Sequence, residues 1–267
     1  MEQLATAFAV IFSMTFIRYL VLAGVPFLLF YMLLSSATPK YKIQERKAVK
    51  KDFLREIMHS GSSSLIFAAM MAITLFTPVR SHTLLYTDAH DYPLWWMPVS
   101  LFLSLVIHDT YFYWMHRLMH HKSIFRFTHV VHHQSVNPSP FAAYSFHILE
   151  AIAEGAIVLI LAFTLPMHRD MLILFTSVSL IINVYGHLGY EIMPKALRHS
   201  YLFEIINTSV HHNLHHSKFK GNYGLYFRWW DRLMKTENPD YVKEYDRIQE
   251  KRFGTKVFKQ VKHEMVQ

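Results

Sequence analysis

The sequence predicts an all-α protein integral to a membrane: a bundle of four to five transmembrane helices with a cytoplasmic helical cap. Three observations lead to this prediction. Apolar residues make up 52% of the 267 residues, they are gathered into long blocks, and polar regions rich in histidine follow two of these blocks. A helix needs about 20 mostly apolar residues to cross a bilayer. Because buried helices of soluble proteins rarely supply so many long apolar runs, we expect a single membrane domain over residues 1–267.

Five apolar blocks approach the length of a membrane span. Arg18 interrupts the apolar run that precedes the first block, so the sequence leaves open whether residues 4–17 extend the first span or lie along the membrane interface. The N-terminus lacks the basic start of a cleaved secretory signal. The expected spans are residues 19–34, 62–78, 93–114, 151–166 and 171–186.

The basic residues set the expected orientation. The run "PKYKIQERKAVKKDFLR" lies between the first two blocks, and the positive-inside rule places such a loop in the cytoplasm. Counting spans from this loop puts both histidine-rich regions, residues 115–150 and 187–235, on the cytoplasmic face. The tail, residues 236–267, alternates in charge like a solvated helix or a partly disordered end. The expected location is the bacterial inner membrane, or the endoplasmic reticulum if the source is eukaryotic.

Charge and cysteine content exclude several classes of protein. The formal net charge is +8, but the basic residues lie beside apolar blocks, so we expect a membrane partner and no nucleic acid. The chain contains no cysteine, which excludes disulfides, thiolate-bound iron–sulfur clusters and a catalytic thiol.

Eight of the 19 histidines fall into three groups, here called the histidine boxes. Histidine is the commonest metal ligand, and on a helix residues three or four apart share one face, so each box can present its nitrogens to a common point. The alternative, surface histidines or satisfied buried ones, requires eight of them to fall at ligand spacings by chance. The boxes are His116 and His120; His129, His132 and His133; His212, His215 and His216.

Eight box histidines exceed the four ligands of a tetrahedral zinc site. A pair of adjacent metal ions accounts for them better. Imidazole binds iron, zinc and copper alike, so zinc can take the place of iron in a purified sample.

Neighbouring residues add candidates. Asp109 lies seven residues before His116 on the same expected helix face, where its carboxylate could accept the proton of an imidazole's other nitrogen. Glu150 opens an apolar block and either supports a box histidine in this way or sits favourably near a helix N-terminus. His108 and His211 are candidate additional ligands, and each is as readily a bystander.

The boxes carry a family resemblance. Their patterns, HX3H and HX2HH twice, resemble those of the membrane fatty-acid hydroxylase and sterol desaturase superfamily, nearest to its sterol desaturase branch. The similarity extends to "HDTYFYWMHRLMHH", "HVVHHQSVNPSPFAAYSFHILE", "GHLGYE" and "HHNLHHSKFKGNYGLYFRWWDRL" and covers roughly residues 98–235.

The resemblance implies a non-haem centre of two iron ions bound by the eight box histidines and by His187, a further ligand that matches the family pattern. In the hydroxylase branch a partner histidine stands four residues before that position. Here the residue is Asn183, a weaker ligand that could act through water or by orienting a neighbour.

The expected function is O2-dependent desaturation or hydroxylation of a membrane lipid, sterol-like or fatty-acyl. No catalytic residue is expected beyond the metal ligands. The chain shows no dinucleotide-binding glycine motif and no cysteines for a cluster, so an external electron donor is implied, a cytochrome or ferredoxin with its reductase. The alternatives are a membrane zinc hydrolase, with metal-bound water as nucleophile, and a metal-handling membrane protein. The residues do not identify the substrate or the oligomeric state.

Overall fold

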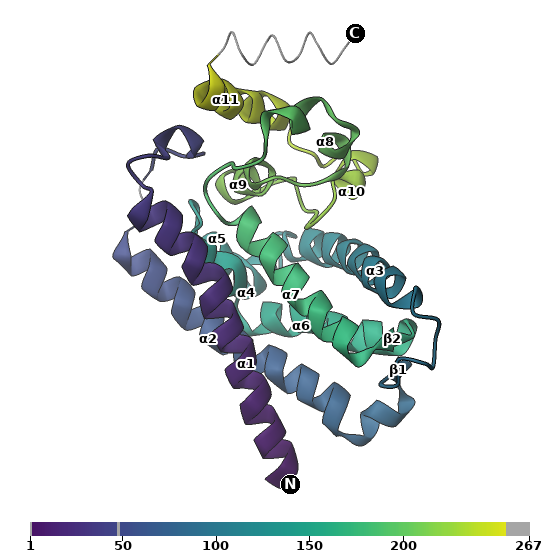
Figure 1. The fold of residues 1–267 in the computed structure, drawn as a ribbon. Coiled ribbons are helices and arrows are strands. Elements are labelled where there is room, and N and C mark those ends of the chain that lie inside the picture. The colour runs from purple at the N-terminus through teal and green to yellow at the C-terminus, as the bar shows by residue number, and fades with distance from the viewer. Residues whose placement is uncertain (1, 47–48, 255–267) are drawn as a thin grey trace.

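The computed structural model describes residues 2–46 and 49–254. Helices occupy all five predicted apolar blocks, so the prediction of a mainly helical protein is confirmed (Figure 1). Within these described residues, three helical segments are long and apolar enough to cross a membrane: Glu2–Leu33, Lys50–Phe76 and Arg169–Gly186. The five long helices are α1 (Glu2–Phe27), α2 (Lys50–Phe76), α3 (Trp96–Met119), α6 (Ile148–Thr164) and α7 (Arg169–Gly186).

The first two helices begin earlier than the apolar blocks do. Residues 4–17 belong to α1, which runs on into a π-helical turn at Leu28–Leu33 just after Pro26. Proline lacks the N–H that an α-helical hydrogen bond needs, and the changed winding follows it directly. The charged start of α2 is helical because Asp52 accepts a hydrogen bond from the N–H of Val49 at 3.2 Å, and a carboxylate is favourable at a helix N-terminus.

The remaining elements are short. Strands β1 (Leu85–Tyr86) and β2 (Met167–His168) pair in parallel. Turns of 3₁₀ helix lie at Pro39–Tyr41, Pro78–His82, Pro140–Tyr144 and Lys195–His199. The short α-helices are α4 (Phe125–Thr128), α5 (Val130–His133), α8 (Tyr201–Ile205), α9 (Ser209–Lys218), α10 (Trp229–Leu233) and α11 (Tyr241–Phe253).

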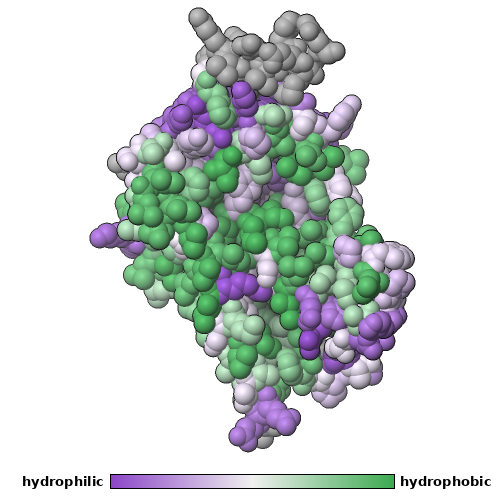
Figure 2. Space-filling view, viewed as in Figure 1, coloured by the Kyte–Doolittle hydropathy of each residue, from purple (hydrophilic) through white to green (hydrophobic). Residues whose placement is uncertain are grey.

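The long helices pack as a bundle. Helix α2 lies between α1 and α6, and α3 packs against α6 and α7. Leu161 of α6 and Leu172 of α7 are fully buried in one hydrophobic core cluster. Hydrophobic side chains also cover the middle of the visible surface, with hydrophilic residues toward both ends (Figure 2). This distribution is the one a bundle needs when lipid surrounds its middle.

The cap of α8, α9, α10 and α11 lies at the opposite end of the molecule from the N-terminus of α1 (Figure 1). Its core contains Phe203, Val210 and three residues of α11, Tyr241, Tyr245 and Ile248. Of the two alternatives predicted for the tail, a solvated helix or a partly disordered end, α11 is a helix, but it is not solvated on all sides. It buries one face because its apolar residues recur at helical spacing. The rest of the tail, residues 255–267, lies outside the described residues.

The basic loop between α1 and α2 lies at this same end. The N–H of Ile43 donates to the carbonyl of Gly189 at 3.1 Å. The side chain of Gln44 donates to Asn213 on α9 at 2.8 Å. The loop thus contacts the segment just after His187 and helix α9, which carries the third histidine box, so it lies on the same side as the later histidines.

Candidate metal centre

The ends of α3 and α7 meet α5 and α9 beneath the cap, and nine histidines converge there. They form two groups, within each of which the ligand atoms lie within 4.8 Å of one another. All are buried except His120, which is partly exposed. The first cluster contains His116, His120, His129, His133 and His215, and the second contains His132, His187, His212 and His216.

The expectation that each box faces a common point is wrong for two boxes. In every box the histidines four residues apart stay together, but the additional histidine of the second and third boxes joins the other cluster. His132 lies in the second cluster while His129 and His133 lie in the first, and His215 is separated from its box partners in the same way. The reason is geometric, because residues i+3 and i+4 differ by 100° around a helix. The clusters adjoin, with the ring centroids of His133 and His216 4.9 Å apart.

Buried hydrogen bonds fix the start of α9, which carries three ligands. The hydroxyl of Thr208 accepts from the N–H of His211 at 3.4 Å. The carboxylate of Glu191 accepts from the N–H of Val210 at 3.2 Å and from the hydroxyl of Tyr185 at 2.8 Å. Sequence reasoning gave Glu191 no role, although it stands in the "GHLGYE" segment.

Backbone carbonyls hold the outer nitrogens of four imidazoles. Nδ1 lies 2.9 Å from the Tyr223 oxygen in His116, 2.8 Å from the Asn183 oxygen in His187, 2.7 Å from the Gly221 oxygen in His215 and 3.3 Å from the Ser145 oxygen in His132. A carbonyl can only accept, so Nδ1 carries the proton in each case and Nε2 of the neutral ring has a bare lone pair.

These bare nitrogens face one another. Nε2 of His132 and Nε2 of His187 are 3.2 Å apart, and both lone pairs point into the second cluster. Nothing on either atom can donate, so the contact is repulsive unless a cation lies between the rings. Imidazole nitrogen lone pairs are the donors that iron and zinc accept, and the residues present therefore fit a pair of metal ions.

Burial favours the uncharged imidazoles that such binding needs. It lowers the pKa of His187 and of His215 to about 4, and it lowers the pKa of His132 well below its ordinary value. Desolvation disfavours the charged form of a base. At neutral pH the imidazoles are thus uncharged and can donate lone pairs to a metal ion. Because burial disfavours the protonated ring, a proton does not readily take the place of the metal cation.

Within residues 2–46 and 49–254, Glu150 is the acidic residue that contacts a cluster nitrogen. Its Oε1 lies 2.6 Å from Nδ1 of His129, and both side chains are buried. A carboxylate in this position fixes the tautomer of the ring and strengthens Nε2 as a donor. Nε2 of His129 lies 2.9 Å from Nε2 of His116 in the first cluster.

With this arrangement established, the chain can be compared with known proteins. A family model for fatty acid hydroxylases matches residues 101–236, which include all nine histidines. The chain belongs to the fatty acid hydroxylase family. No solved structure matches it.

Curated relatives of this family member act on sterols according to their names. Delta(7)-sterol 5(6)-desaturase ERG3B of Gibberella zeae is 32% identical over 209 residues, which cover 76% of this chain and 63% of that protein. Lathosterol oxidase of Mus musculus is 32% identical over 191 residues, covering 69% and 61%. Methylsterol monooxygenase 1 of Danio rerio is 32% identical over 169 residues, covering 60% and 57%. The chain thus spans about three fifths of the length of these relatives.

Asp109 requires a correction, because it does not contact an imidazole as expected. Its Oδ1 accepts from the N–H groups of Leu225, Tyr226 and Phe227 at 3.2, 2.7 and 3.2 Å. Seven residues of helix amount to about 10.5 Å along the axis, which is too far for its short side chain to reach His116. The two residues share a helix face but lie too far apart along the helix axis for their side chains to meet.

Asp109 nevertheless supports this family member's first cluster through a loop. Asp231 accepts from the N–H groups of Tyr223 and Gly224 at 2.9 and 2.7 Å. Together the two aspartates hold the segment whose carbonyls accept from His116 and His215. Sequence reasoning did not find Asp231, since a carboxylate that binds backbone amides has no characteristic spacing.

The remaining candidates lie outside the clusters. Nδ1 of His108 is 2.7 Å from the hydroxyl of Tyr226, and His211 packs against Tyr241 with ring centroids 5.0 Å apart. The side-chain amide of Asn183 donates to the carbonyl of Ala143 at 2.8 Å. Asn183 contacts His187 through its backbone carbonyl instead. Neither His108 nor His211 belongs to either cluster, so the structure does not group them with the ligands as the sequence suggested.

Proposed function

We propose that the chain is an O2-dependent oxidoreductase that uses two iron ions to desaturate or hydroxylate a membrane lipid. The observation that carries the proposal is the pair of adjoining imidazole clusters with unprotonated Nε2 atoms. Two bound irons would supply the activation of O2 and the removal of hydrogen from an unactivated C–H bond, which side chains cannot do. The names of the relatives, two sterol desaturase types and a methylsterol monooxygenase, support this reaction class.

The protein's own residues have three tasks in this proposal. The nine histidines bind the two ions. Glu150, the four backbone carbonyls and the loop held by Asp109 and Asp231 orient the rings. The bundle and cap exclude water, since eight of the nine ligands are buried.

The clusters differ in the number of donors. The first holds five imidazoles and the second four. For six-coordinate ions this leaves more open positions at the second cluster, which we propose is the one nearer the substrate. Phe146, beside His132 with ring centroids 5.1 Å apart, also lines a pocket between the helices.

We also propose that α3 and α6 cross the membrane with the three candidate spans, giving five passes with the histidines in the cytoplasm. The basic loop beside the clusters supports this orientation under the positive-inside rule. If the source is eukaryotic, the membrane is that of the endoplasmic reticulum. Because no cysteine is present for a cluster, we propose that a separate cytochrome or ferredoxin with its reductase supplies the electrons.

The test is to purify the protein without oxygen and measure iron and zinc, then follow O2 uptake with a reductant, an electron-donor pair and a lipid extract. Mass spectrometry of the lipids should show a loss of two hydrogens or a gain of one oxygen. Cleavage of an ester without O2 uptake would instead indicate the zinc hydrolase, and metal binding without any lipid change would indicate a metal-handling protein.

A further inference from the structure

A pocket, partly open to the outside and here called the cavity, lies between α1, α2, α3, α6 and α7. One end reaches the second cluster, because Phe146 packs against His132 and the carbonyl of Asn183 accepts from His187. Most of the wall is hydrocarbon and aromatic, as at Phe67, Ile157 and Phe175. The cavity therefore suits the body of a lipid.

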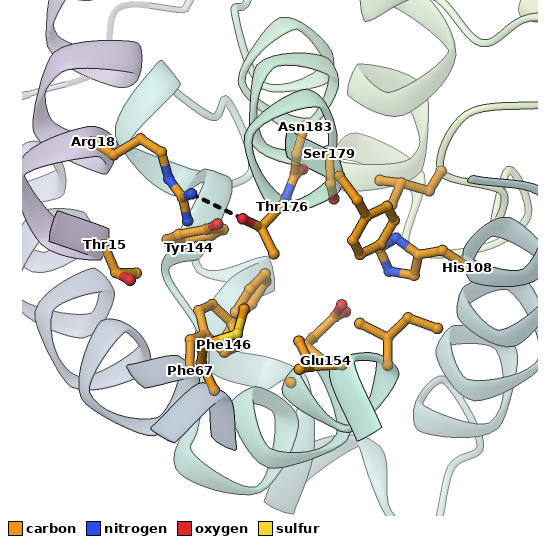
Figure 3. Close-up of a pocket in the computed structure, with 16 residues that line it drawn as sticks. Thr15, Arg18, Phe67, His108, Tyr144, Phe146, Glu154, Thr176, Ser179 and Asn183 are labelled. Atoms are coloured by element: carbon orange, nitrogen blue, oxygen red, sulfur yellow. Dashed lines mark hydrogen bonds between the residues drawn. The ribbon is translucent and has the colours of Figure 1, made fainter. Parts of the chain in front are cut away.

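Among the described residues of this wall, Glu154 and His108 carry hydrogen-bonding atoms without a partner, as Arg18 does at Nε. Glu154 projects into the cavity from α6 (Figure 3), and its carboxyl has no hydrogen-bond or ion-pair partner among the residues that the structure describes. His108 lines the cavity from α3, with Nε2 buried and unpaired while Nδ1 contacts Tyr226. Burying a polar group without a hydrogen bond is unfavourable, and an ionisable residue at bilayer depth usually serves a function.

The charge opposite Glu154 restricts what the cavity can accept. Arg18 enters from α1 and donates to Thr176 at 2.8 Å and to Ser177 at 3.2 Å, and Figure 3 shows it across the cavity from Glu154. A charged lipid group here would be attracted by one of these two side chains and repelled by the other when both are ionised. A neutral hydroxyl avoids this conflict and can both donate and accept.

A plain alkyl chain fits this wall poorly. It would cover Glu154 and the free nitrogen of His108 and leave both unpaired, which is unfavourable. A site built to hydrogen-bond a hydroxyl discriminates strongly against an analogue that lacks it.

We infer that Glu154, with His108 beside it, hydrogen-bonds a hydroxyl group of the lipid substrate and so determines specificity for neutral lipid alcohols. The inference rests on the proposed function in taking this cavity as the substrate site. It assigns recognition to α6 and α3 and leaves metal binding to the histidine clusters.

The test measures binding without turnover, on the full-length iron-loaded protein in lipid nanodiscs under anaerobic conditions. Two pairs of probes are compared: cholestanol with its methyl ether, and 1-hexadecanol with hexadecyl methyl ether. In at least one pair the wild type should bind the alcohol roughly 10-fold more tightly than the ether, as one hydrogen bond implies. The pair that responds distinguishes a sterol from a long-chain alcohol.

Three variants complete the design. Glu154→Leu should reduce the alcohol-to-ether ratio to about one, and Glu154→Gln, which can still accept a hydrogen bond, should give an intermediate ratio. Met71→Leu, a change of similar volume in the apolar wall, should leave the ratio unchanged. Iron content and melting temperature are measured on each preparation. If Glu154→Leu does not fold, the ratio of Glu154→Gln decides.

Equal affinities within both pairs for the wild type, or an unchanged ratio in a folded Glu154 variant, would overturn the inference. A failure of the proposed function would give a different result from a failure of this inference. A wild-type protein that discriminates between alcohol and ether but takes up no O2 would refute the oxidoreductase proposal and leave hydroxyl recognition standing.

Discussion

His132 and His133 are consecutive in the chain, yet their ring planes lie at 89° and they belong to different clusters. Helix α5 is a single turn that ends between the two sites, so one step along the backbone moves from one cluster to the other. The same division occurs at His215 and His216, whose ring planes lie at 88°. The paired site is thus built from box residues that alternate between its two halves.

This arrangement predicts separate effects for the two neighbours. His132→Ala should deplete the second cluster and His133→Ala the first, so each variant should retain about one iron ion and lose more than about 100-fold in lipid oxidation. Metal analysis and spectra of the remaining iron would distinguish the two sites. His90→Ala, in an exposed loop, is the control and should keep both ions. Full activity in either cluster variant would contradict the proposed site.

Glu150→Gln should weaken the first cluster without unfolding the protein. The amide oxygen can still accept from Nδ1 of His129, but the negative charge that strengthens the ring as a ligand is lost. Partners of this kind typically change metal affinity by about 10–100-fold. Competition with a chelator measures that affinity. An unchanged affinity would mean that Glu150 only fills space at the start of α6.

Gly221→Ala should disturb the carbonyl that holds His215. Gly221 has φ +76°, a conformation that favours glycine, and an added Cβ would collide with the carbonyl oxygen of Thr236. We expect a loss of at least about 1 kcal/mol in stability together with reduced metal content in the first cluster.

Gly254→Ala is the matched control for this substitution. Gly254 has φ +82°, and its added Cβ would meet nothing within 4 Å. This variant should lose only the stability that it costs to place alanine at a positive φ, and it should keep its metal. Equal metal loss in both variants would show that the collision at Gly221 does not matter.

The metal-free protein should become less stable as the pH falls. Burial holds the pKa of His187 and His215 at about 4 in the folded chain, against about 6.5 when unfolded. Between these values the unfolded state binds more protons, so stability decreases as the pH falls from about 6.5 toward 4. Melting temperatures of the apoprotein over this range test the prediction, and a flat profile would contradict it.

Restoring metal should separate folding from catalysis. Removal of metal with a chelator should lower the melting temperature, because a bound ion stabilises only the folded state. Added Zn2+ and Fe2+ should both restore it, since imidazole accepts either ion, but O2 uptake should return with Fe2+ alone. Equal O2 uptake with zinc would exclude redox chemistry at the metal.

The sequence by itself determined the helical blocks, the nine clustered histidines, the carboxylate at Glu150 and the family. These features depend on local composition and spacing, which a chain carries whatever its fold. Only the tertiary structure decided which histidine joins which cluster, because His132 and His133 differ by one residue and by about 100° around α5. It also decided that Asp109 binds backbone amides and that carbonyls such as Gly221 orient the rings. Every residue has a carbonyl and an N–H, so their partners are set by the packing of distant segments and have no signature in the residue types.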